Sequence, residues 1–265
     1  MKTKNTPFSR GRNYRYFIDL VIQKAKAGLR AEASRGYLGV LWWVIEPVIY
    51  MGVFYIVFAH LRGRGDKNFV MFLLTGLIVW KWFHASVNTG SSSLMTNAGL
   101  MNLVYLPKIV FPLTNIAVNT FKFFIIVALF LVFMQFSNIQ PSLAWALLPV
   151  LILVELLLIV AVTSLLAAVM PFFPDLRVIL DNLLIMMFFL SGIFFDIAKM
   201  PESVKGYLQL NPMAVLITMY RDLLLHGVAP DWRSIVFVTL FSLAVFFPAL
   251  WLYRRFDRVY PKIIH

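Results

Sequence analysis

The chain has 265 residues, of which 61% are hydrophobic and only 14% are charged, and its mean hydropathy is +0.81. A soluble domain of this length needs more polar surface, so the composition predicts an integral membrane protein. The net charge of +12 gathers toward the two ends of the chain, which favours anionic lipid head groups over nucleic acid as a partner. Because the chain has no cysteine, disulfides, thiol nucleophiles and thiolate metal sites are excluded.

Residues 1–36 are predicted to form a cytoplasmic tail and an amphipathic helix. The first residues are basic and polar and contain no apolar signal-peptide core. The apolar positions that follow recur at helical spacing: Tyr14, Phe17, Ile18, Val21, Ala25, Gly28 and Leu29. Basic and polar residues fall on the other faces, so the helix is expected to lie in the inner membrane interface. A plain soluble helix is the alternative.

Residues 37–265 are predicted to form a single all-α polytopic transmembrane domain. Runs near the length that crosses a ~30 Å hydrocarbon core define six spans. These spans are 38–61, 69–87, 110–136, 143–170, 178–195 and 235–253. The tails and even-numbered loops carry 15 Lys and Arg residues against 7 on the other side, which places both termini in the cytoplasm.

The segment between the fifth and sixth spans does not read as an ordinary loop. Pro201, Gly206, Pro212 and Gly227 interrupt it too often for a membrane crossing, yet residues 213–225 are too apolar for an aqueous connection. Irregular backbone at membrane depth is tolerated only against protein or a cavity. We therefore expect short re-entrant or interfacial helices at the outer leaflet.

Motifs for catalysis are missing from the sequence. No phosphate-binding loop of the type G-x-x-x-x-G-K-[ST] is present, so ATP hydrolysis by that route is excluded. The four histidines are isolated, and no metal site or cofactor is expected. Asp175, Asp181 and Asp196 are dispersed rather than clustered as a metal-dependent enzyme requires. A membrane-embedded glycosyl- or acyltransferase acting on lipid-linked sugars remains the alternative, and a secondary carrier would need internal repeats that we do not find.

Four ionisable residues lie inside the predicted spans and are candidates for function because such residues are costly in lipid. They are Glu46, Lys81, Lys122 and Glu155. Counting 1.5 Å per residue, Glu46 and Lys81 lie at similar depths, and Lys122 and Glu155 both lie near mid-membrane. We therefore predict the pairs Glu46 with Lys81 and Lys122 with Glu155. The alternative role of these charges is simply to hold helices together.

Aromatic residues are frequent on the first two spans. They are Trp42, Trp43, Tyr50, Tyr55, Trp80, Trp82 and Phe83. Such residues commonly anchor helices at the membrane interface. The second interpretation is that several line a pathway in which flat rings pack against the C–H faces of sugars.

Three stretches resemble the permease subunits of ABC exporters for capsule and O-antigen polysaccharides. The first runs from Arg35 to Pro47 and contains Leu-Gly-Val-Leu-Trp-Trp, the second is Phe173-Pro-Asp-Leu-Arg177, and the third is Asn211-Pro-Met213 followed by Arg221-Asp222. With the six-span layout, the resemblance covers nearly the whole chain. The second stretch departs from the family's Phe-Arg-Asp order, so only its position at a cytoplasmic turn is carried over.

The resemblance implies a homodimer in a bacterial inner membrane, bound by two copies of a separate ABC ATPase and exporting a polyprenyl-diphosphate-linked polysaccharide. The amphipathic N-terminal helix and the loop 88–108 would receive the movement of the ATPase. The loop would do so as a short coupling helix, or else be a passive connector. Its candidate residues are Leu100, Asn102, Tyr105 and Lys108. Arg30 and Arg35 would attract the lipid diphosphate, although the same charges also satisfy the positive-inside rule.

Overall fold

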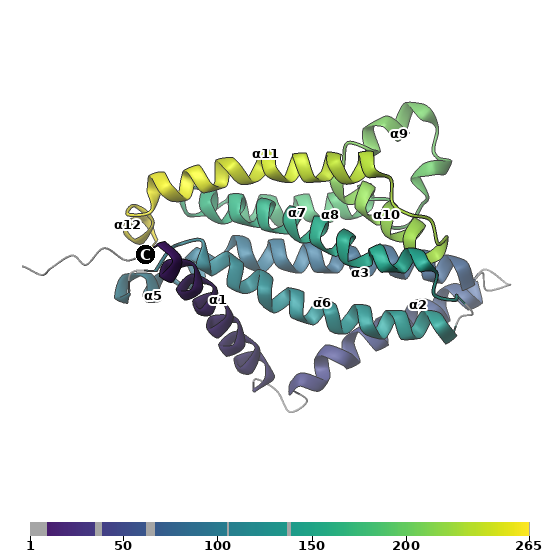
Figure 1. The fold of residues 1–265 in the computed structure, drawn as a ribbon, viewed down its shortest axis with the longest axis horizontal. Helices are drawn as coiled ribbons and strands as arrows, with labels where there is room; N and C mark the ends of the chain where they lie inside the picture. The colour runs from purple at the N-terminus through teal and green to yellow at the C-terminus, as the bar shows by residue number, and fades with distance from the viewer. Residues whose placement is uncertain (1–9, 35–38, 62–66, 105, 137–138, 265) are drawn as a thin grey trace, which may run out of the picture.

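The computed structural model describes residues 10–34, 39–61, 67–104, 106–136 and 139–264, and every regular element in these ranges is a helix (Figure 1). The long helices are α1 (Arg10–Ala33), α2 (Trp42–Leu61), α3 (Lys67–Ser91), α6 (Val110–Phe136), α7 (Leu148–Val169), α8 (Leu176–Leu190) and α11 (Trp232–Phe256). The short α-helices are α4 (Ser93–Thr96), α5 (Ala98–Leu103), α9 (Glu202–Leu208), α10 (Pro212–Leu225) and α12 (Tyr260–Ile263). The 3-10 helices are η1 (Gly39–Leu41), η2 (Leu143–Leu147), η3 (Met170–Phe172) and η4 (Ile197–Lys199).

Four helical segments in the described part of the chain are long and apolar enough to cross a membrane. They are Phe69–Ser91, Val110–Phe136, Leu143–Phe172 and Trp232–Phe256. These segments coincide with the predicted second, third, fourth and sixth spans, with ends that differ by a few residues. The chain is therefore a multi-pass membrane protein.

The predicted fifth span, 178–195, is wrong at its C-terminal end. Helix α8 stops at Leu190, and its 15 residues reach only about 22 Å. The chain turns at Gly192, whose φ of +70° is a left-handed conformation that side chains with a Cβ rarely adopt. The apolar run continues past this turn, which explains why hydropathy alone placed the boundary too late.

Helix α3 is the centre of the bundle and packs against α6, α7 and α10, while α11 packs along α7. The contact between α3 and α7 is close because a glycine faces a small residue. A Cβ on Gly90 would lie 2.3 Å from Cγ2 of Thr163, which is fully buried. Small residues at such crossings let helix backbones approach closely where lipid supplies no hydrophobic drive.

Helices α1 and α2 form a V that stands out from the bundle (Figure 1). Helix α1 runs obliquely along α6, and α2 contacts both α3 and α6. Ala25 and Gly28 face α6, with the Cβ position of Gly28 only 3.5 Å from Val118. We call residues 10–34 and 39–61 together the α1–α2 arm.

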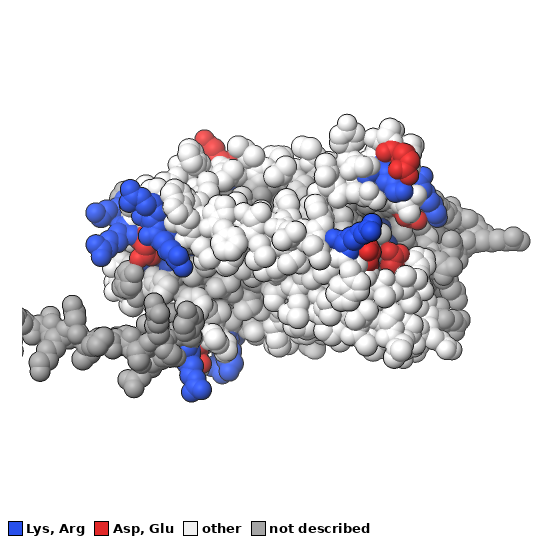
Figure 2. All heavy atoms as spheres, turned by 45° about the horizontal axis from the view of Figure 1, so that its top comes forward, with Lys and Arg blue, Asp and Glu red and all other residues white. Residues whose placement is uncertain are grey.

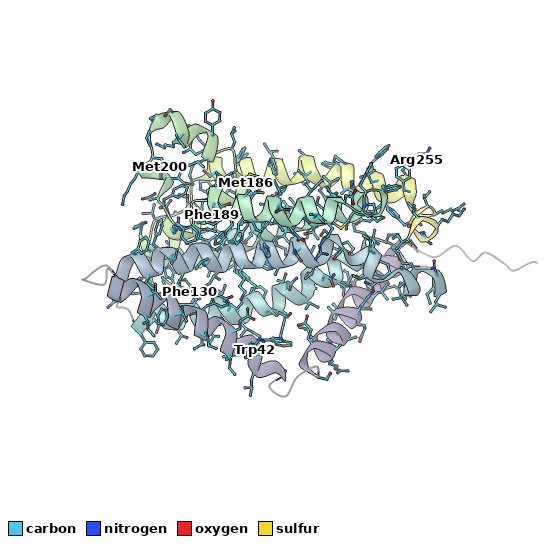
Figure 3. All side chains as sticks on the ribbon, turned by 180° about the vertical axis from the view of Figure 1, so that it is seen from behind. Trp42, Phe130, Met186, Phe189, Met200 and Arg255 are labelled. Carbon is cyan, nitrogen blue, oxygen red and sulfur yellow. The ribbon has the colours of Figure 1, made fainter. Side chains whose placement is uncertain are left out.

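The two ends of the molecule differ from its middle. Charged side chains gather at both ends, and a broad stretch without them lies between on the face in Figure 2. One end holds α5, α12 and the start of α1, and the other holds α9 (Figure 1). Arg255 and Met200 mark these opposite ends in Figure 3. An uncharged belt between charged ends is the surface expected of a protein embedded in a bilayer.

The end that holds α12 has a small hydrophobic core of its own. Leu94, Met101, Phe111 and Tyr260 are buried there together, and Leu20 of α1 packs against them. The Tyr260 hydroxyl donates a hydrogen bond of 3.0 Å to the carbonyl oxygen of Ala168. This core joins α1, α5, α6 and α12 at one end of the bundle.

Candidate functional site: a cavity behind the α1–α2 arm

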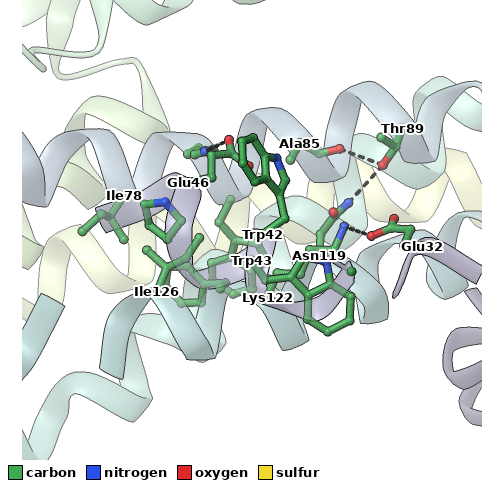
Figure 4. Close-up of a pocket in the computed structure, with 15 residues that line it drawn as sticks. Glu32, Trp42, Trp43, Glu46, Ile78, Ala85, Thr89, Asn119, Lys122 and Ile126 are labelled. Carbon is green, nitrogen blue, oxygen red and sulfur yellow. Dashed lines mark hydrogen bonds and ion pairs between the residues drawn. The ribbon is translucent and has the colours of Figure 1, made fainter. Parts of the chain in front are cut away.

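A cavity of about 780 Å³ lies between the α1–α2 arm and helices α3 and α6 (Figure 4). We call it the arm cavity. Its wall is mostly apolar and aromatic and carries a few polar side chains. The lining includes Glu32, Trp42, Trp43, Glu46, Lys81, Trp82, Ala85, Thr89, Asn119 and Lys122.

The predicted pair between Glu46 and Lys81 is confirmed. The Lys81 Nζ donates to the Glu46 carboxylate at 2.5 Å, joining α3 to α2. The same ammonium group lies 4.7 Å from the centroid of the Tyr50 ring, which adds a cation–π contact. A charge inside a predicted span is thus neutralised by its neighbour across the α2–α3 hairpin.

The predicted pair between Lys122 and Glu155 is wrong. Lys122 forms its ion pair with Glu32, near the end of α1, and its Nζ lies 5.9 Å from the Trp43 ring centroid. Glu155 is fully buried in α7, close to the Tyr220 hydroxyl of α10. Depth along a span gives the height of a side chain but not the direction in which it points, and the two side chains have different neighbours.

The predicted pathway aromatics divide into three groups. Trp42, Trp43 and Trp82 line the arm cavity; the Trp82 ring stacks on Phe123 at a centroid distance of 4.0 Å, and Trp43 meets Phe121 edge-on. Tyr50 and Trp80 line a second cavity of about 390 Å³ between α2, α3 and α8, where Trp80 packs against Phe188.

Phe83 and Tyr55 are the remaining two predicted pathway aromatics. Phe83 lies in the buried core, 3% exposed. The side chain of Tyr55 lies outside the described residues. Lys81 lines both cavities, so the Glu46–Lys81 pair stands where they adjoin.

The predicted coupling residues lie at the end of the molecule that holds α12. Leu100 and Asn102 are exposed on α5, together with Leu103 at 83% exposure. Lys108 is buried and its Nζ donates to the Leu106 carbonyl oxygen at 3.1 Å. Tyr105 lies outside the described residues. The exposed face of α5 therefore carries two leucines beside Asn102, and exposed apolar side chains often mark a surface that docks on another protein.

Helix α1 is tied to the predicted coupling segment by Lys24. Its Nζ donates to the Asn97 side-chain oxygen at 3.0 Å and lies 3.8 Å from the centroid of the Phe111 ring. Burial lowers the pKa of Lys24 to about 8. Arg30 is exposed further along α1, and Arg35 lies outside the described residues.

Sequence reasoning missed the structural role of Arg221. This side chain is 4% exposed on α10, and its guanidinium donates to the carbonyl oxygens of Phe72 (3.1 Å), Gly192 (2.8 Å) and Ile193 (2.8 Å). It also lies 3.3 Å from the centroid of the Phe72 ring. Arg221 thus joins α10, α3 and the turn after α8. The available signal was the charged step Arg221-Asp222 within a largely apolar helix.

Within the described residues, no three His, Asp or Glu side chains are grouped so that they could hold a metal ion. Residues 26–225 match the sequence profile of the ABC-2 type transporters. This chain belongs to the ABC-2 type transporter family. It is therefore the membrane-spanning component of an ABC transporter, and this membership implies an ABC ATPase as its partner.

Curated relatives of this ABC-2 chain align over most of their length. The O-antigen export system permease protein RfbA of Klebsiella pneumoniae is 25% identical over 235 residues, covering 88% of this chain and 91% of the relative. Its counterpart in Myxococcus xanthus is 29% identical over 232 residues, covering 87% and 89%. The polysialic acid transport protein KpsM of Escherichia coli is 28% identical over 240 residues, covering 85% and 89%.

Proposed function

We propose that this chain is the transmembrane subunit of an ATP-driven exporter that moves a polyprenyl-diphosphate-linked polysaccharide across the bacterial inner membrane. The observation that carries the proposal is the near full-length alignment with O-antigen permeases and a polysialic acid transport protein. The ABC-2 membership leaves the membrane-enzyme alternative without support. The cargo is a surface glycan of the O-antigen or capsule type.

In this exporter two copies of the chain form the membrane part, and two copies of a separate ATPase bind the end that carries α5 and α12. The exposed apolar side chains Leu100 and Leu103 support α5 as the surface that docks on the ATPase. The contact of Lys24 with Asn97 would pass a movement of α5 to α1. Arg30 and Arg35 would attract the lipid diphosphate at the same membrane face.

The membrane topology that goes with this function has six spans and cytoplasmic termini. Helices α2 and α8 would supply the first and fifth spans beside the four long segments. Helices α9 and α10 would then lie at the outer leaflet. The basic residues on α1, at the end of α11 and on α12 support a cytoplasmic position for that end.

Export is tested by deleting the gene in its native host and restoring it on a plasmid. The expected result is loss of the surface glycan and its accumulation inside the cell, reversed by the restored gene. The purified chain should carry a phosphate-loop ATPase in equal copies. Normal surface glycan in the deletion strain, together with a chain that purifies alone, would contradict the proposal.

Topology is tested with single cysteines, which the cysteine-free chain makes simple. Ser203→Cys on α9 should react with a membrane-impermeant maleimide in intact spheroplasts. Arg255→Cys at the end of α11 should react only after the membrane is opened. The reverse pattern would invert the proposed orientation. Labelling of both cysteines from outside would contradict the single membrane crossing by α11 between Ser203 and Arg255.

A further inference from the structure

The arm cavity carries four charged side chains whose charges cancel. Lys81 is paired with Glu46 and Lys122 is paired with Glu32. An anionic ligand would have to displace a carboxylate from a lysine before it gained a partner, which costs the existing pair. The cavity wall is therefore better suited to a neutral ligand than to a phosphate or diphosphate group.

The polar groups on this wall still have hydrogen-bonding capacity. Each ion pair joins one carboxylate oxygen to one ammonium group, although a carboxylate has two oxygens and an ammonium three donors. Asn119 donates from its amide nitrogen to the Thr89 hydroxyl at 3.0 Å, which leaves its own carbonyl oxygen as an acceptor. The wall thus offers both donors and acceptors, which match the hydroxyl groups of a sugar because each hydroxyl can donate and accept.

Flat aromatic faces stand beside these polar groups. Trp42 is 50% exposed at the start of α2, and Figure 3 shows it near the apex of the V. Trp43 and Trp82 complete the aromatic part of the wall, with Trp82 fixed by stacking on Phe123. A lipid tail would use the apolar wall but leave the remaining hydrogen-bonding capacity of these polar groups unused, whereas a sugar ring uses both.

We propose that the arm cavity binds neutral sugar units of the transported glycan. Trp42 and Trp82 pack on the C–H faces of the rings, while the two ion pairs and Asn119 bond their hydroxyl groups. The volume of about 780 Å³ falls within the ~300–1,000 Å³ typical of ligand pockets, so the site holds a short oligosaccharide segment. This proposal rests on the proposed function and assigns a saccharide site within one protomer.

The test measures protection of a single cysteine in the permease–ATPase complex in nanodiscs. Ala85→Cys places a thiol on the cavity wall, and Ser203→Cys on α9 is the control at the outer end. The probe is the oligosaccharide released by mild acid from the host's own surface glycan. We expect it to slow maleimide labelling of Ala85→Cys at least fivefold and to leave Ser203→Cys unchanged.

Two comparison ligands distinguish the possible occupants. Inorganic diphosphate should not protect Ala85→Cys, and changing the nanodisc phospholipid should not alter its labelling rate. Protection by diphosphate, sensitivity to the phospholipid alone, or no protection by the oligosaccharide would each overturn the proposal. These outcomes are separate from failure of the proposed function, which appears as normal surface glycan in the deletion strain.

Ring substitutions test the role of Trp42 directly. Trp42→Leu in the Ala85→Cys background should abolish protection by the oligosaccharide, and Trp42→Phe should restore most of it. Trp251→Leu is the matched control, because Trp251 is similarly exposed but lies on α11, away from the arm cavity. Each variant is first shown to remain bound to the ATPase and to give a normal gel-filtration profile. Protection that survives Trp42→Leu would refute the stacking role.

Discussion

Helices α2 and α3 are neighbours in sequence but are held in the fold by different means. In an apolar 18-residue stretch of α3, 72% of the sequence is buried. Neighbouring elements approach α3 closely at Gly76 and Gly90. Among the side chains of α2 that the structure describes, only Pro47 and Met51 are buried. The α2 helix instead meets the bundle through the Glu46–Lys81 pair beside two cavities. One helix is fixed by close packing, and the other by a polar contact with space around it.

The largest expected effect concerns the N-terminal end of α3, where Arg221 of α10 is bound. Arg221→Gln removes the guanidinium that bonds Phe72, Gly192 and Ile193, leaving buried carbonyl groups without donors. Because each such group costs roughly 1–3 kcal/mol, we expect a loss of about 3 kcal/mol or more, seen as a lower melting temperature in detergent. Arg233→Gln on the exposed start of α11 is the control and should change little. Equal melting temperatures for both variants would contradict this role.

A second prediction compares a glycine-to-alanine substitution in α3 with one in α2. Gly90→Ala puts a Cβ 2.3 Å from Cγ2 of Thr163 and should cost about 1–3 kcal/mol through overpacking. Gly52→Ala on α2 meets nothing within 4 Å and should gain up to about 1 kcal/mol in helix propensity. Melting temperatures should therefore move in opposite directions. If they move together, the contrast between α2 and α3 is wrong.

A third prediction concerns the ion pair that joins the two helices. Glu46→Lys or Lys81→Glu alone places like charges together, and the double swap should restore the contact. Their side chains are 40% and 43% exposed, so the pair contributes only about 1 kcal/mol to stability. The measurement is export of surface glycan and the melting temperature for all three variants. A double variant no better than the worse single one would show that the pair does not matter.

A fourth prediction is a pH dependence of stability that arises from Lys24. Burial lowers the folded-state pKa to about 8 from an ordinary value of 10.5. Between these values the unfolded chain binds more protons than the folded one, so the stability of the native protein rises with pH across this window. The melting temperature should rise from pH 8 to pH 10 relative to that of Lys24→Met, which does not titrate. A difference that stays constant or shrinks would refute the assignment.

The four long spans could be predicted because each is an unbroken apolar helix. The C-terminal end of α8 could not be predicted, because the turn depends on the left-handed conformation of Gly192 within a continuing apolar run. Hydropathy measures transfer into lipid and carries no information on backbone direction. The oblique course of α1 along α6 was likewise invisible, since an amphipathic pattern fits both a lipid interface and a protein surface.

Only one of the two ion pairs of the candidate site was predicted, because a sequence pattern gives depth in the membrane but not the direction of a side chain. Glu46 and Lys81 lie on adjacent helices of one hairpin, so their similar depth in the membrane was enough to predict the pair. Lys122 and Glu155 also match in depth, but successive helical residues turn by about 100°. Lys122 lines the arm cavity, whereas Glu155 is fully buried on α7. The partner of Lys122 came from α1, whose position no pattern within the spans could provide. The acceptors of Arg221 are backbone carbonyl groups, which leave no mark on the side-chain pattern.

The way in which α12 is seated bears on how the protein should be handled. Tyr260 is fully buried and hydrogen-bonded to Ala168, and Ile264 is also buried in the same small core. An affinity tag or fluorescent protein fused directly after the last residue would compete with this packing and should reduce yield. A flexible Gly/Ser spacer of about ten residues gives a reach of roughly 16–19 Å and should restore it.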